Sequence, residues 1–212
     1  MKNLRDSLLL YAVTDRRGLG EKTLVQAVEE ALRGGATMIQ LREKDVSPEQ
    51  FIAEALALKP VCARYGAPLI INDNVEVALA CDADGVHVGQ DDTSLTEARA
   101  KLGPGKIIGV SAHNVEEALK AERDGADYLG SGSVFATGTK NNVTQLPLDE
   151  LDRICSSVKI PVVAIGGIGA DNMPLLSGRG AAGAAVVSAI FSAEDIEAAA
   201  KRLRALAEKT FR

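Results

Sequence analysis

The sequence has few aromatic residues and no tryptophan: four phenylalanines and three tyrosines make up 3% of its 212 residues. Lys and Arg are spread along the chain rather than gathered in a basic block, and the formal net charge is −5. Nucleic-acid-binding surfaces combine clustered cations with aromatic rings that stack on bases. The composition therefore argues against a nucleic-acid partner.

Long apolar runs are also lacking, since none approaches the ~18 residues that a membrane-spanning helix needs. The early apolar run Ser7–Val13 leads into the charged stretch Thr14–Arg17, which is unlike a secretory cleavage site. The three cysteines, Cys62, Cys81 and Cys155, are widely spaced and show no metal-ligand spacing. These features predict a cytoplasmic protein with reduced thiols and no membrane partner.

What is present is the composition of a globular protein, with 46% hydrophobic residues, 25% charged residues and 20 glycines. The length allows one large hydrophobic core. Because no low-complexity linker divides the chain, we expect a single domain over residues 1–212.

Short β-rich runs alternate with segments of helical periodicity. The expected strands are Leu8–Val13, Met38–Leu41, Leu69–Ile71, Gly85–Val88, Ile107–Val110, Tyr128–Gly130, Val162–Ile165 and Ala184–Val187. Helical spacing is found around 24–32 and 51–58 and over Val75–Ala80, Leu95–Leu102, Val115–Arg123, Leu148–Ser156 and Ile196–Ala207. With a further helical segment before Gly178, eight β units and eight helical segments at this length predict an α/β protein, a (β/α)₈ TIM barrel. A doubly wound open sheet is the alternative.

One short motif points to a different function but has the wrong context. Residues Gly178–Gly183 match the G-x-G-x-x-G fingerprint of dinucleotide-binding proteins. That motif acts between a strand and the helix that follows it. Here it follows a helical segment and precedes the expected strand Ala184–Val187, so we interpret it as a helix-to-strand turn.

Polar residues gather at the carboxyl ends of the expected strands, which form the active face of a TIM barrel. They are Asp15, Gln40, Arg42, Lys44, Asn72, Asp73, His87, Gln90, Asp91, Asp92, Ser111, His113, Ser131, Ser133 and Ser188. Each has a structural explanation by itself, such as a solvated loop residue or a helix cap, and His87 has that of a core histidine. Their occurrence on one predicted face favours an active site there.

The residue types at this face suggest phosphate chemistry. Arg42, Lys44 and Lys140 carry the positive charge that neutralises phosphate oxygens. Asp73 and Asp92 are carboxylates of the kind that hold Mg²⁺, which completes its shell with water and substrate phosphates.

A second anion site is expected across the same face. The turn Gly166–Gly169 and the pair Val187-Ser188 follow the seventh and eighth expected strands, where barrels frequently bind a phosphate. Two anion sites indicate two phosphorylated substrates, or one long diphosphate that reaches both. The polar segment Phe135–Pro147 is long for a strand-to-helix connection and predicts a lid, with a surface excursion as the alternative.

Eight stretches occur in a family-like order: Tyr11–Asp15, Gln40–Lys44, Ile71–Asp73, Gly85–Asp92, Gly109–Ser111, Phe135–Lys140, Ala164–Ile168 and Val187–Ile190. Any one of them alone is weak evidence. Together they resemble the thiamine-phosphate synthase family from near the start of the chain to its end.

The resemblance implies an enzyme that joins hydroxymethylpyrimidine diphosphate to a thiazole phosphate and releases diphosphate. The residues implied for the pyrimidine diphosphate are Gln40, Leu41, Arg42, Glu43, Lys44, Asn72, Ser111 and Lys140. Those implied for the thiazole phosphate are Thr137, Gly138, Thr139, Gly167, Val187 and Ser188, and those for Mg²⁺ are Asp73 and Asp92. The implied catalytic residues are Arg42, Lys44, Lys140 and Ser111. The implied chemistry is dissociative, with the thiazole nitrogen capturing a pyrimidinylmethyl cation after the diphosphate departs.

The sequence departs from the family pattern in the expected lid. Ser133 and Ala136 stand where proline is frequent, and Asn141-Asn142 replaces a common Pro-Asp pair. These departures predict a more flexible lid and altered closure rather than lost chemistry.

Three other functions stay open at this stage. A thiazole tautomerase shares the barrel but lacks much of the diphosphate and metal apparatus. A sugar-phosphate isomerase or epimerase needs an acid–base pair, for which His87 with Asp15 is a thin candidate. A non-catalytic module would bind only a phosphorylated thiazole or thiamine phosphate. The complete set of expected diphosphate and metal residues favours the synthase, and a homo-oligomer is left open.

Overall fold

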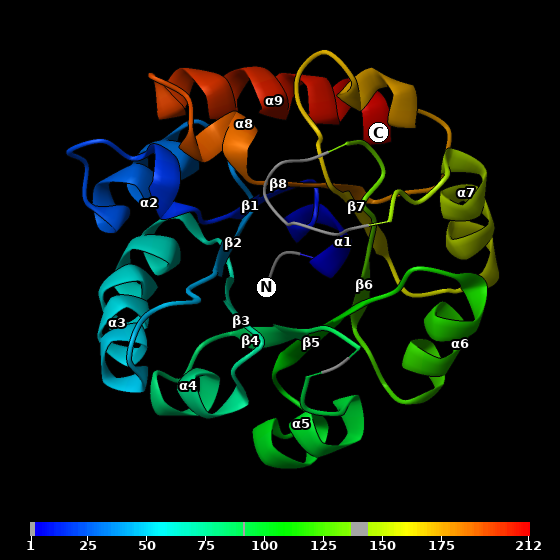
Figure 1. Cartoon of the computed structure of the whole chain (residues 1–212), viewed down its shortest axis with the longest axis horizontal. Helices are drawn as coiled ribbons and strands as arrows, with labels where there is room; N and C mark the ends of the chain where they lie inside the picture. The colour runs from blue at the N-terminus through cyan, green and yellow to red at the C-terminus, as the bar shows by residue number, and fades with distance from the viewer. Residues whose placement is uncertain (1–2, 91, 137–143) are drawn as a thin grey trace.

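A computed structural model describes residues 3–90, 92–136 and 144–212, and in those residues eight parallel strands close into a barrel (Figure 1). The strands are β1 (Leu10–Val13), β2 (Met38–Leu41), β3 (Leu69–Asn72), β4 (Gly85–Val88), β5 (Ile107–Ser111), β6 (Tyr128–Ser131), β7 (Val162–Ile165) and β8 (Gly183–Val186). Each strand pairs with the next along the chain, and β8 pairs with β1. The fold is the predicted TIM barrel.

A ring of helices surrounds the barrel, as Figure 1 shows. The main helices are α2 (Leu24–Arg33), α3 (Pro48–Tyr65), α4 (Val75–Ala80), α5 (Leu95–Leu102), α6 (Val115–Arg123), α7 (Leu148–Ser157) and α9 (Ile196–Phe211). Shorter turns of helix are α1 (Leu4–Ser7), η1 (Arg16–Gly18), η2 (Met173–Leu176) and α8 (Ser188–Phe191). The last helix, α9, packs against α2 and completes the ring. None of the helices in the described residues is long and apolar enough to cross a membrane.

The structure corrects two details of the predicted element order. The first strand begins at Leu10 rather than Leu8, because the chain leaves α1 and makes a turn before it joins the sheet. Between β7 and β8 the expected helical segment is a short 3₁₀ helix, η2. Gly178 and Gly180, at φ 76° and 82°, lead from η2 into β8. The G-x-G-x-x-G stretch is therefore the helix-to-strand turn that its position indicated.

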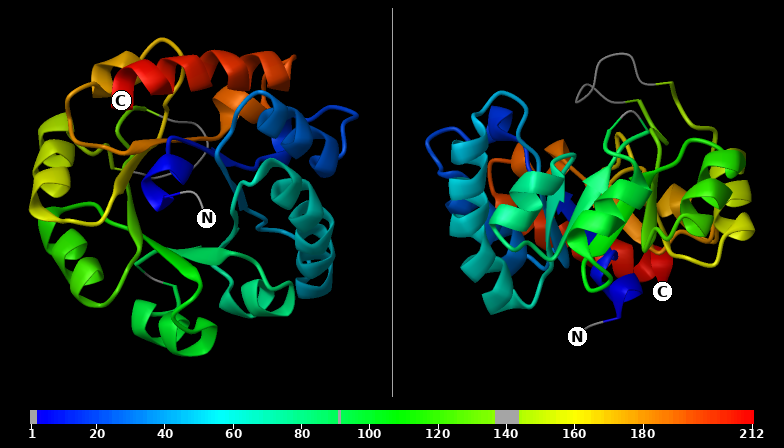
Figure 2. Two further views of the ribbon diagram at one scale, coloured as in Figure 1. Left: turned by 180° about the vertical axis from the view of Figure 1, so that it is seen from behind. Right: turned by 90° about the horizontal axis from the view of Figure 1, so that it is seen from below.

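Alternation along the strands divides their side chains between two hydrophobic clusters. The inner cluster fills the barrel and contains Leu8, Tyr11, Val13, Met38, Ile70, Tyr128, Val163, Ala182 and Ala185. The outer cluster, which includes Ile39 and Leu41, lies between the barrel and its helices. Leu4 of α1 packs against the inner cluster, and Figure 2 shows α1 across the barrel opening when the molecule is seen from behind.

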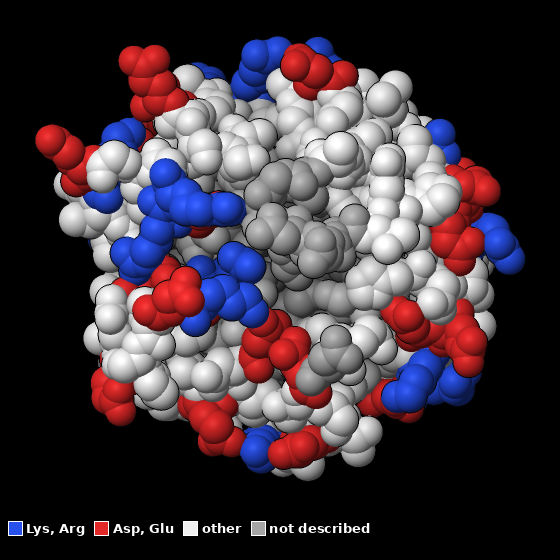
Figure 3. Space-filling view, viewed as in Figure 1, with Lys and Arg blue, Asp and Glu red and all other residues white. Residues whose placement is uncertain are grey.

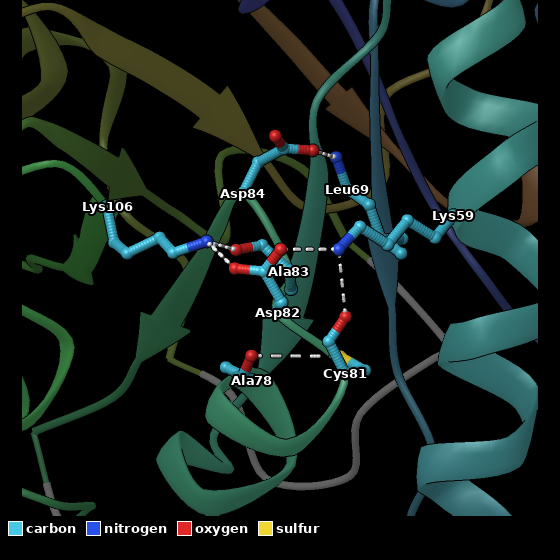
Figure 4. A network of polar contacts seen from close by, with 8 residues as sticks. All are labelled: Lys59, Leu69, Ala78, Cys81, Asp82, Ala83, Asp84 and Lys106. Carbon is cyan, nitrogen blue, oxygen red and sulfur yellow. Dashed lines mark hydrogen bonds and ion pairs between the residues drawn. The ribbon is translucent and has the colours of Figure 1, made fainter.

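Salt bridges join α3 to the segments that precede β4 and β5 (Figure 4). Lys59 and Lys106 donate hydrogen bonds to Asp82 at 2.7 and 2.6 Å. Chiefly through the contact with Lys106, these cations lower the pKa of Asp82 to about 2. The Asp84 carboxylate accepts a hydrogen bond from the Leu69 N–H at 2.8 Å. The contacts at this end, where β4 and β5 begin, stabilise the barrel, and in a TIM barrel the active site lies at the opposite end, where the strands have their carboxyl ends.

We expect Gly85→Ala to lower the free energy of unfolding by about 1–3 kcal/mol, because overpacking of a well-packed core has that cost. A Cβ at Gly85 would collide with the backbone carbonyl of Ile107 on β5, to which β4 is hydrogen-bonded. The matched control is Gly105→Ala, since Gly105 faces open space and its φ is not positive. Chemical denaturation of both variants is the measurement, and equal losses of stability would contradict the prediction.

Candidate active site

A cavity of about 390 Å³ opens at the carboxyl ends of the strands. Figure 3 shows Lys and Arg side chains gathered at this end of the molecule, on the side where the segments after β1 and β2 lie. The described residues that were expected at the site and line this cavity are Gln40, Arg42, Lys44, Asn72, Asp73, Asp92, Ser111, Gly167, Val187 and Ser188. Residues spread over most of the chain therefore meet at one cavity.

Two expected residues lie elsewhere, because alternation along β2 and the segment after it points them away from the cavity. Leu41 is fully buried in the outer cluster between barrel and helices. The Glu43 carboxylate accepts a hydrogen bond from Arg16 at 2.8 Å, and Arg16 also reaches Glu54 at 2.6 Å. Burial raises the pKa of Glu43 despite that ion pair. The structure thus assigns packing and ion-pair contacts, and no place in the cavity, to Leu41 and Glu43.

The expected lid falls largely outside the described residues. Thr137, Gly138, Thr139 and Lys140 lie there, as do Asp91 and the pair Asn141-Asn142. Ser133, which precedes this segment, lines the cavity and donates a hydrogen bond to the Phe135 carbonyl at 2.7 Å.

A pair of carboxylates forms one edge of the cavity. Asp73 follows β3 in the left-handed region, at φ 62°, and its backbone N–H donates to the His87 carbonyl at 2.8 Å. The Asp73 carboxylate accepts a hydrogen bond from Lys44 at 2.6 Å, and that of Asp92 accepts one from the Gly89 N–H at 2.7 Å. The structure therefore holds two acidic groups and one cation side by side.

The two carboxylates differ in acidity because their surroundings differ. Burial raises the pKa of Asp92, and the negative charge of neighbouring Asp73 adds to that rise. Burial is the largest effect on Asp73 and opposes its ionisation, but the hydrogen bond and charge of Lys44, together with hydrogen bonds from Asp92 and Asn72, outweigh it and lower the pKa of that carboxyl.

The donor set at this edge fits Mg²⁺. The described residues hold no group of three or more His, Cys, Asp and Glu side chains arranged around a metal position. Mg²⁺ is usually bound by one or two carboxylates, with waters and substrate phosphates as its other ligands. Asp73 and Asp92 supply two carboxylates beside a cavity wide enough for such ligands.

Across the cavity, a glycine turn follows β7. Gly167 has φ 62°, and a Cβ there would collide with the carbonyl oxygen of Ala136. The Asn172 amide braces the turn, because it donates to the Gly167 carbonyl and accepts from the Gly169 N–H, both at 2.8 Å. Ser188, at the start of α8, also lines this side. Backbone N–H groups at such turns suit phosphate oxygens.

The floor of the cavity is a chain of hydrogen-bonded side chains. Gln40 Nε2 donates to Tyr11 Oη at 2.7 Å, and Tyr11 Oη lies 2.8 Å from Tyr128 Oη. Tyr128 Oη lies 3.0 Å from His87 Nδ1, and His87 Nε2 lies 3.1 Å from Ser111 Oγ. Burial raises the pKa of both tyrosines, so their hydroxyls stay protonated.

No role for the two tyrosines was predicted from the sequence, and His87 could be either a core or a site residue. Tyr11 lines the cavity together with Val13, two positions further along β1. That spacing was the available signal, because residues two apart on a strand face the same side. Tyr128 does not line the cavity and is fully buried beneath it.

Asp15, the candidate acid–base partner of His87, is engaged elsewhere. Its carboxylate accepts hydrogen bonds from Arg17, the shortest at 2.6 Å, and this contact lowers the pKa of Asp15. His87 instead contacts Tyr128 and Ser111. The observation that favoured an isomerase or epimerase is therefore removed.

Comparison with known proteins gives a consistent result. The chain matches the family described as thiamine monophosphate synthase over residues 10–190. It is 51% identical over 197 residues to the thiamine-phosphate synthase of Clostridium acetobutylicum, covering 93% of this chain and 92% of that protein. It is 52% identical over 205 residues to that of Chloroflexus aurantiacus, with 95% and 93% covered.

A solved structure agrees with these matches. The thiamine phosphate pyrophosphorylase from Pyrococcus furiosus superposes with a TM-score of 0.91 at 44% identity, covering 99% of this chain and 100% of that one.

We expect the Lys44→Gln variant to raise the pKa of Asp73, because the cation that favours its ionised form is lost. The pKa of Asp92 should rise as well, since the charge of Lys44 also lowers it. In the wild type the depressed pKa of Asp73 contributes stability above the ordinary carboxyl range, which is lost as pH falls through the folded-state value. Lys44→Gln should remove that part of the pH dependence.

Carboxyl ¹³C NMR titration measures both values. The control is Lys22→Gln, which removes an ion pair with Glu30 on the outer ring of helices. Unchanged Asp73 and Asp92 titrations in Lys44→Gln would show that the ion pair does not form in solution.

Proposed function

The chain belongs to the thiamine monophosphate synthase family and is a transferase that makes thiamine phosphate, and from this premise we propose how its cavity carries out the reaction. The substrates are hydroxymethylpyrimidine diphosphate and hydroxyethylthiazole phosphate, and the products are thiamine phosphate and diphosphate. The observation that carries the proposal is that one cavity has two ends suited to anions. One end has Arg42, Lys44 and the carboxylate pair, and the other has the glycine turn at Gly167.

The first end binds the diphosphate group. Arg42 offers a planar pair of donors to phosphate oxygens, and Lys44 offers a mobile point charge. Gln40, Asn72 and Ser111 line the cavity beside them and place hydrogen-bonding groups around the pyrimidine ring. Because Asp73 already accepts from Lys44, its carboxylate also orients that cation within the site.

Asp73 and Asp92 are the residues that would hold Mg²⁺, the cofactor we propose. When bound, Mg²⁺ supplies positive charge that stabilises the diphosphate as it departs. The two carboxylates keep this charge beside the leaving group rather than elsewhere in the cavity. Their acidic character also balances Arg42 and Lys44 before substrate binds.

The second end binds the thiazole phosphate. Gly167, Val187 and Ser188 line it, and backbone N–H groups of the turn and of the start of α8 would donate to phosphate oxygens. Thr137, Gly138 and Thr139 are proposed to complete this end. Lys140 is proposed to reach the diphosphate. These four residues lie outside the described part of the chain.

The residues at the two ends account for a dissociative reaction. Negative charge grows on the diphosphate as its bond to the pyrimidinylmethyl carbon breaks, and Arg42, Lys44 and Ser111 stabilise that charge in place. The thiazole nitrogen then forms the new bond to the cationic carbon. The reaction requires neither a nucleophile nor a general base from the protein, so alignment of the two substrates is the main contribution of the chain.

The same residues favour this reaction over the alternatives. A tautomerase or a phosphorylated-thiazole binding module would need only the end at Gly167. The paired carboxylates beside Arg42 and Lys44 are explained by a diphosphate leaving group and its metal ion.

We further propose that residues 1–212 act as one TIM-barrel domain in the cytoplasm, on small phosphorylated molecules. The thiols support this location, because Cys62, Cys81 and Cys155 are free, as expected in a reducing compartment.

The direct test of the function supplies both phosphorylated heterocycles with Mg²⁺ and measures thiamine phosphate and diphosphate by chromatography. We expect equimolar formation of the two products. Release of diphosphate without thiamine phosphate, or no reaction by correctly folded protein, would reject the proposed coupling.

Asp92→Ala should lower kcat by roughly 100-fold, since a metal ion supplies several kcal/mol of charge stabilisation. Raising the Mg²⁺ concentration should restore part of the activity, because Asp73 still binds the ion. Asp171→Ala serves as the control, as Asp171 is a fully exposed carboxylate with a distant ion pair to Arg202. Full activity of Asp92→Ala at low Mg²⁺ would remove Asp92 from the metal site.

A further inference from the structure

We propose that Tyr128 is a positioning residue for this reaction. Its buried hydroxyl fixes neutral His87 as the tautomer with its proton on Nε2, and His87 in turn directs the hydroxyl proton of Ser111 into the cavity. The consequence for catalysis rests on the proposed function, because it requires that Ser111 contact the pyrimidine diphosphate. The direction of the hydrogen bonds is a property of the free protein.

The two tyrosines are buried and remain un-ionised, so each hydroxyl keeps its proton. Gln40 Nε2 donates to Tyr11 Oη, so the proton of Tyr11 points along the chain to Tyr128 Oη, 2.8 Å away. Tyr128 Oη, which now accepts, has His87 Nδ1 at 3.0 Å as the acceptor for its own proton. A buried hydroxyl without an acceptor is costly, so this order of donors is strongly favoured.

The directions of the remaining hydrogen bonds follow from the chemistry of imidazole. A neutral imidazole has one N–H donor and one acceptor nitrogen. Because Nδ1 of His87 accepts from Tyr128, its proton resides on Nε2, which lies 3.1 Å from Ser111 Oγ. Ser111 Oγ therefore accepts from His87, and its own O–H is directed away from His87 toward the cavity that Ser111 lines.

The alternative is that all the hydrogen bonds between Gln40 and Ser111 run in the opposite direction. In it Ser111 donates to His87 Nε2, and His87 Nδ1–H donates to Tyr128. Tyr128 then donates to Tyr11, and Tyr11 donates to the side-chain amide oxygen of Gln40. Ser111 would then offer the cavity only an acceptor, which is unsuited to a negatively charged leaving group. The orientation of the Gln40 amide, with its nitrogen on Tyr11, selects the first direction.

Packing holds the rings of the hydrogen-bonded side chains in place. The Tyr128 ring occupies the space that a side chain at position 109 would need, because a Cβ on Gly109 would collide with that ring. The His87 imidazole lies over Gly130, where an added Cβ would come within 2.9 Å of its ring carbon, and its centroid is 5.5 Å from that of Tyr128. Two glycines thus make room for the rings that carry the hydrogen bonds.

The tautomer of His87 is tested in the protein without substrate, by ¹⁵N NMR of the imidazoles at a pH above the ordinary histidine range. The chain has two histidines, and His113→Gln identifies the signals of His87. We expect the wild type to show the Nε2–H form. In Tyr128→Phe the Nδ1 acceptor loses its donor, so the spectrum should move toward the Nδ1–H form or a mixture.

Tyr11→Phe is the control that matches Tyr128→Phe, because Tyr11 belongs to the same row of hydrogen bonds. It removes one buried hydroxyl, as Tyr128→Phe does, but it leaves the contact between Tyr128 and His87 intact. Tyr11→Phe also removes the acceptor that Tyr128 would need in the opposite direction, so the Tyr128 hydroxyl still donates to His87 and we expect the Nε2–H form to be retained. A wild type in the Nδ1–H form, or equal spectra for the two variants, would overturn the proposal whatever the activity of the enzyme.

Kinetics test the consequence for catalysis. In Tyr128→Phe we expect kcat to fall roughly tenfold, as for one misdirected hydrogen bond in the transition state, with a change in KM for the pyrimidine diphosphate below about threefold. Tyr65→Phe is the control, because the Tyr65 hydroxyl makes a long contact of 3.5 Å with Glu29 on the outer ring of helices.

The outcomes separate the two claims. Absence of coupling in the wild type would reject the proposed function but leave the NMR result valid. A Tyr128→Phe enzyme with a lower unfolding midpoint but wild-type kcat and tautomer would show that Tyr128 only packs the barrel, which overturns the positioning role. A lower kcat with a changed tautomer and a native unfolding midpoint supports it.

Discussion

The contact between the hydroxyls of Tyr11 and Tyr128 lies at the centre of the barrel, and much of the structure follows from what two buried tyrosines require. Their rings fill the interior directly beneath the cavity, packed edge to face with centroids 6.0 Å apart. Their hydroxyls are removed from water and need partners, since an unsatisfied buried group costs about 1–3 kcal/mol. The partners are Gln40 and His87, both of which line the cavity. The packing of the core and the polarity of the site therefore depend on the same atoms.

Cations are placed at the cavity edge independently of the net charge of the protein. The chain is acidic overall, with a formal net charge of −5, and its substrates are anions. Arg42 and Lys44 stand at the cavity edge, while many acidic residues pair with cations on the outer surface, as Asp82 does with Lys59 and Lys106. Screening limits the reach of surface charges to about 10 Å, so groups within the cavity decide the affinity for phosphates.

Much of the fold and part of the site could be predicted from the sequence. The strands were located within one or two residues because each is a short apolar run next to a glycine or polar turn, and β2 was located without error. Gln40, Arg42 and Lys44 line the same cavity, as expected for residues two apart on an extended chain. The same rule excludes Leu41 and Glu43, which a motif taken as a continuous stretch had included. The helical segment expected before Gly178 is present but short, since η2 is a 3₁₀ helix of four residues.

The sequence by itself determined the order and the apolar spacing of the strands and helices, and this predicts a barrel. It also determined at which end of the barrel the polar residues gather. Those are local properties, because the spacing of apolar residues and the residue types after each strand are written along the chain. Only the tertiary structure decided that Tyr11, Tyr128, His87 and Ser111 form one hydrogen-bonded chain. These residues come from four different strands and meet only when the barrel closes. Hydrogen-bond partners depend on distances of about 3 Å, which no linear pattern specifies.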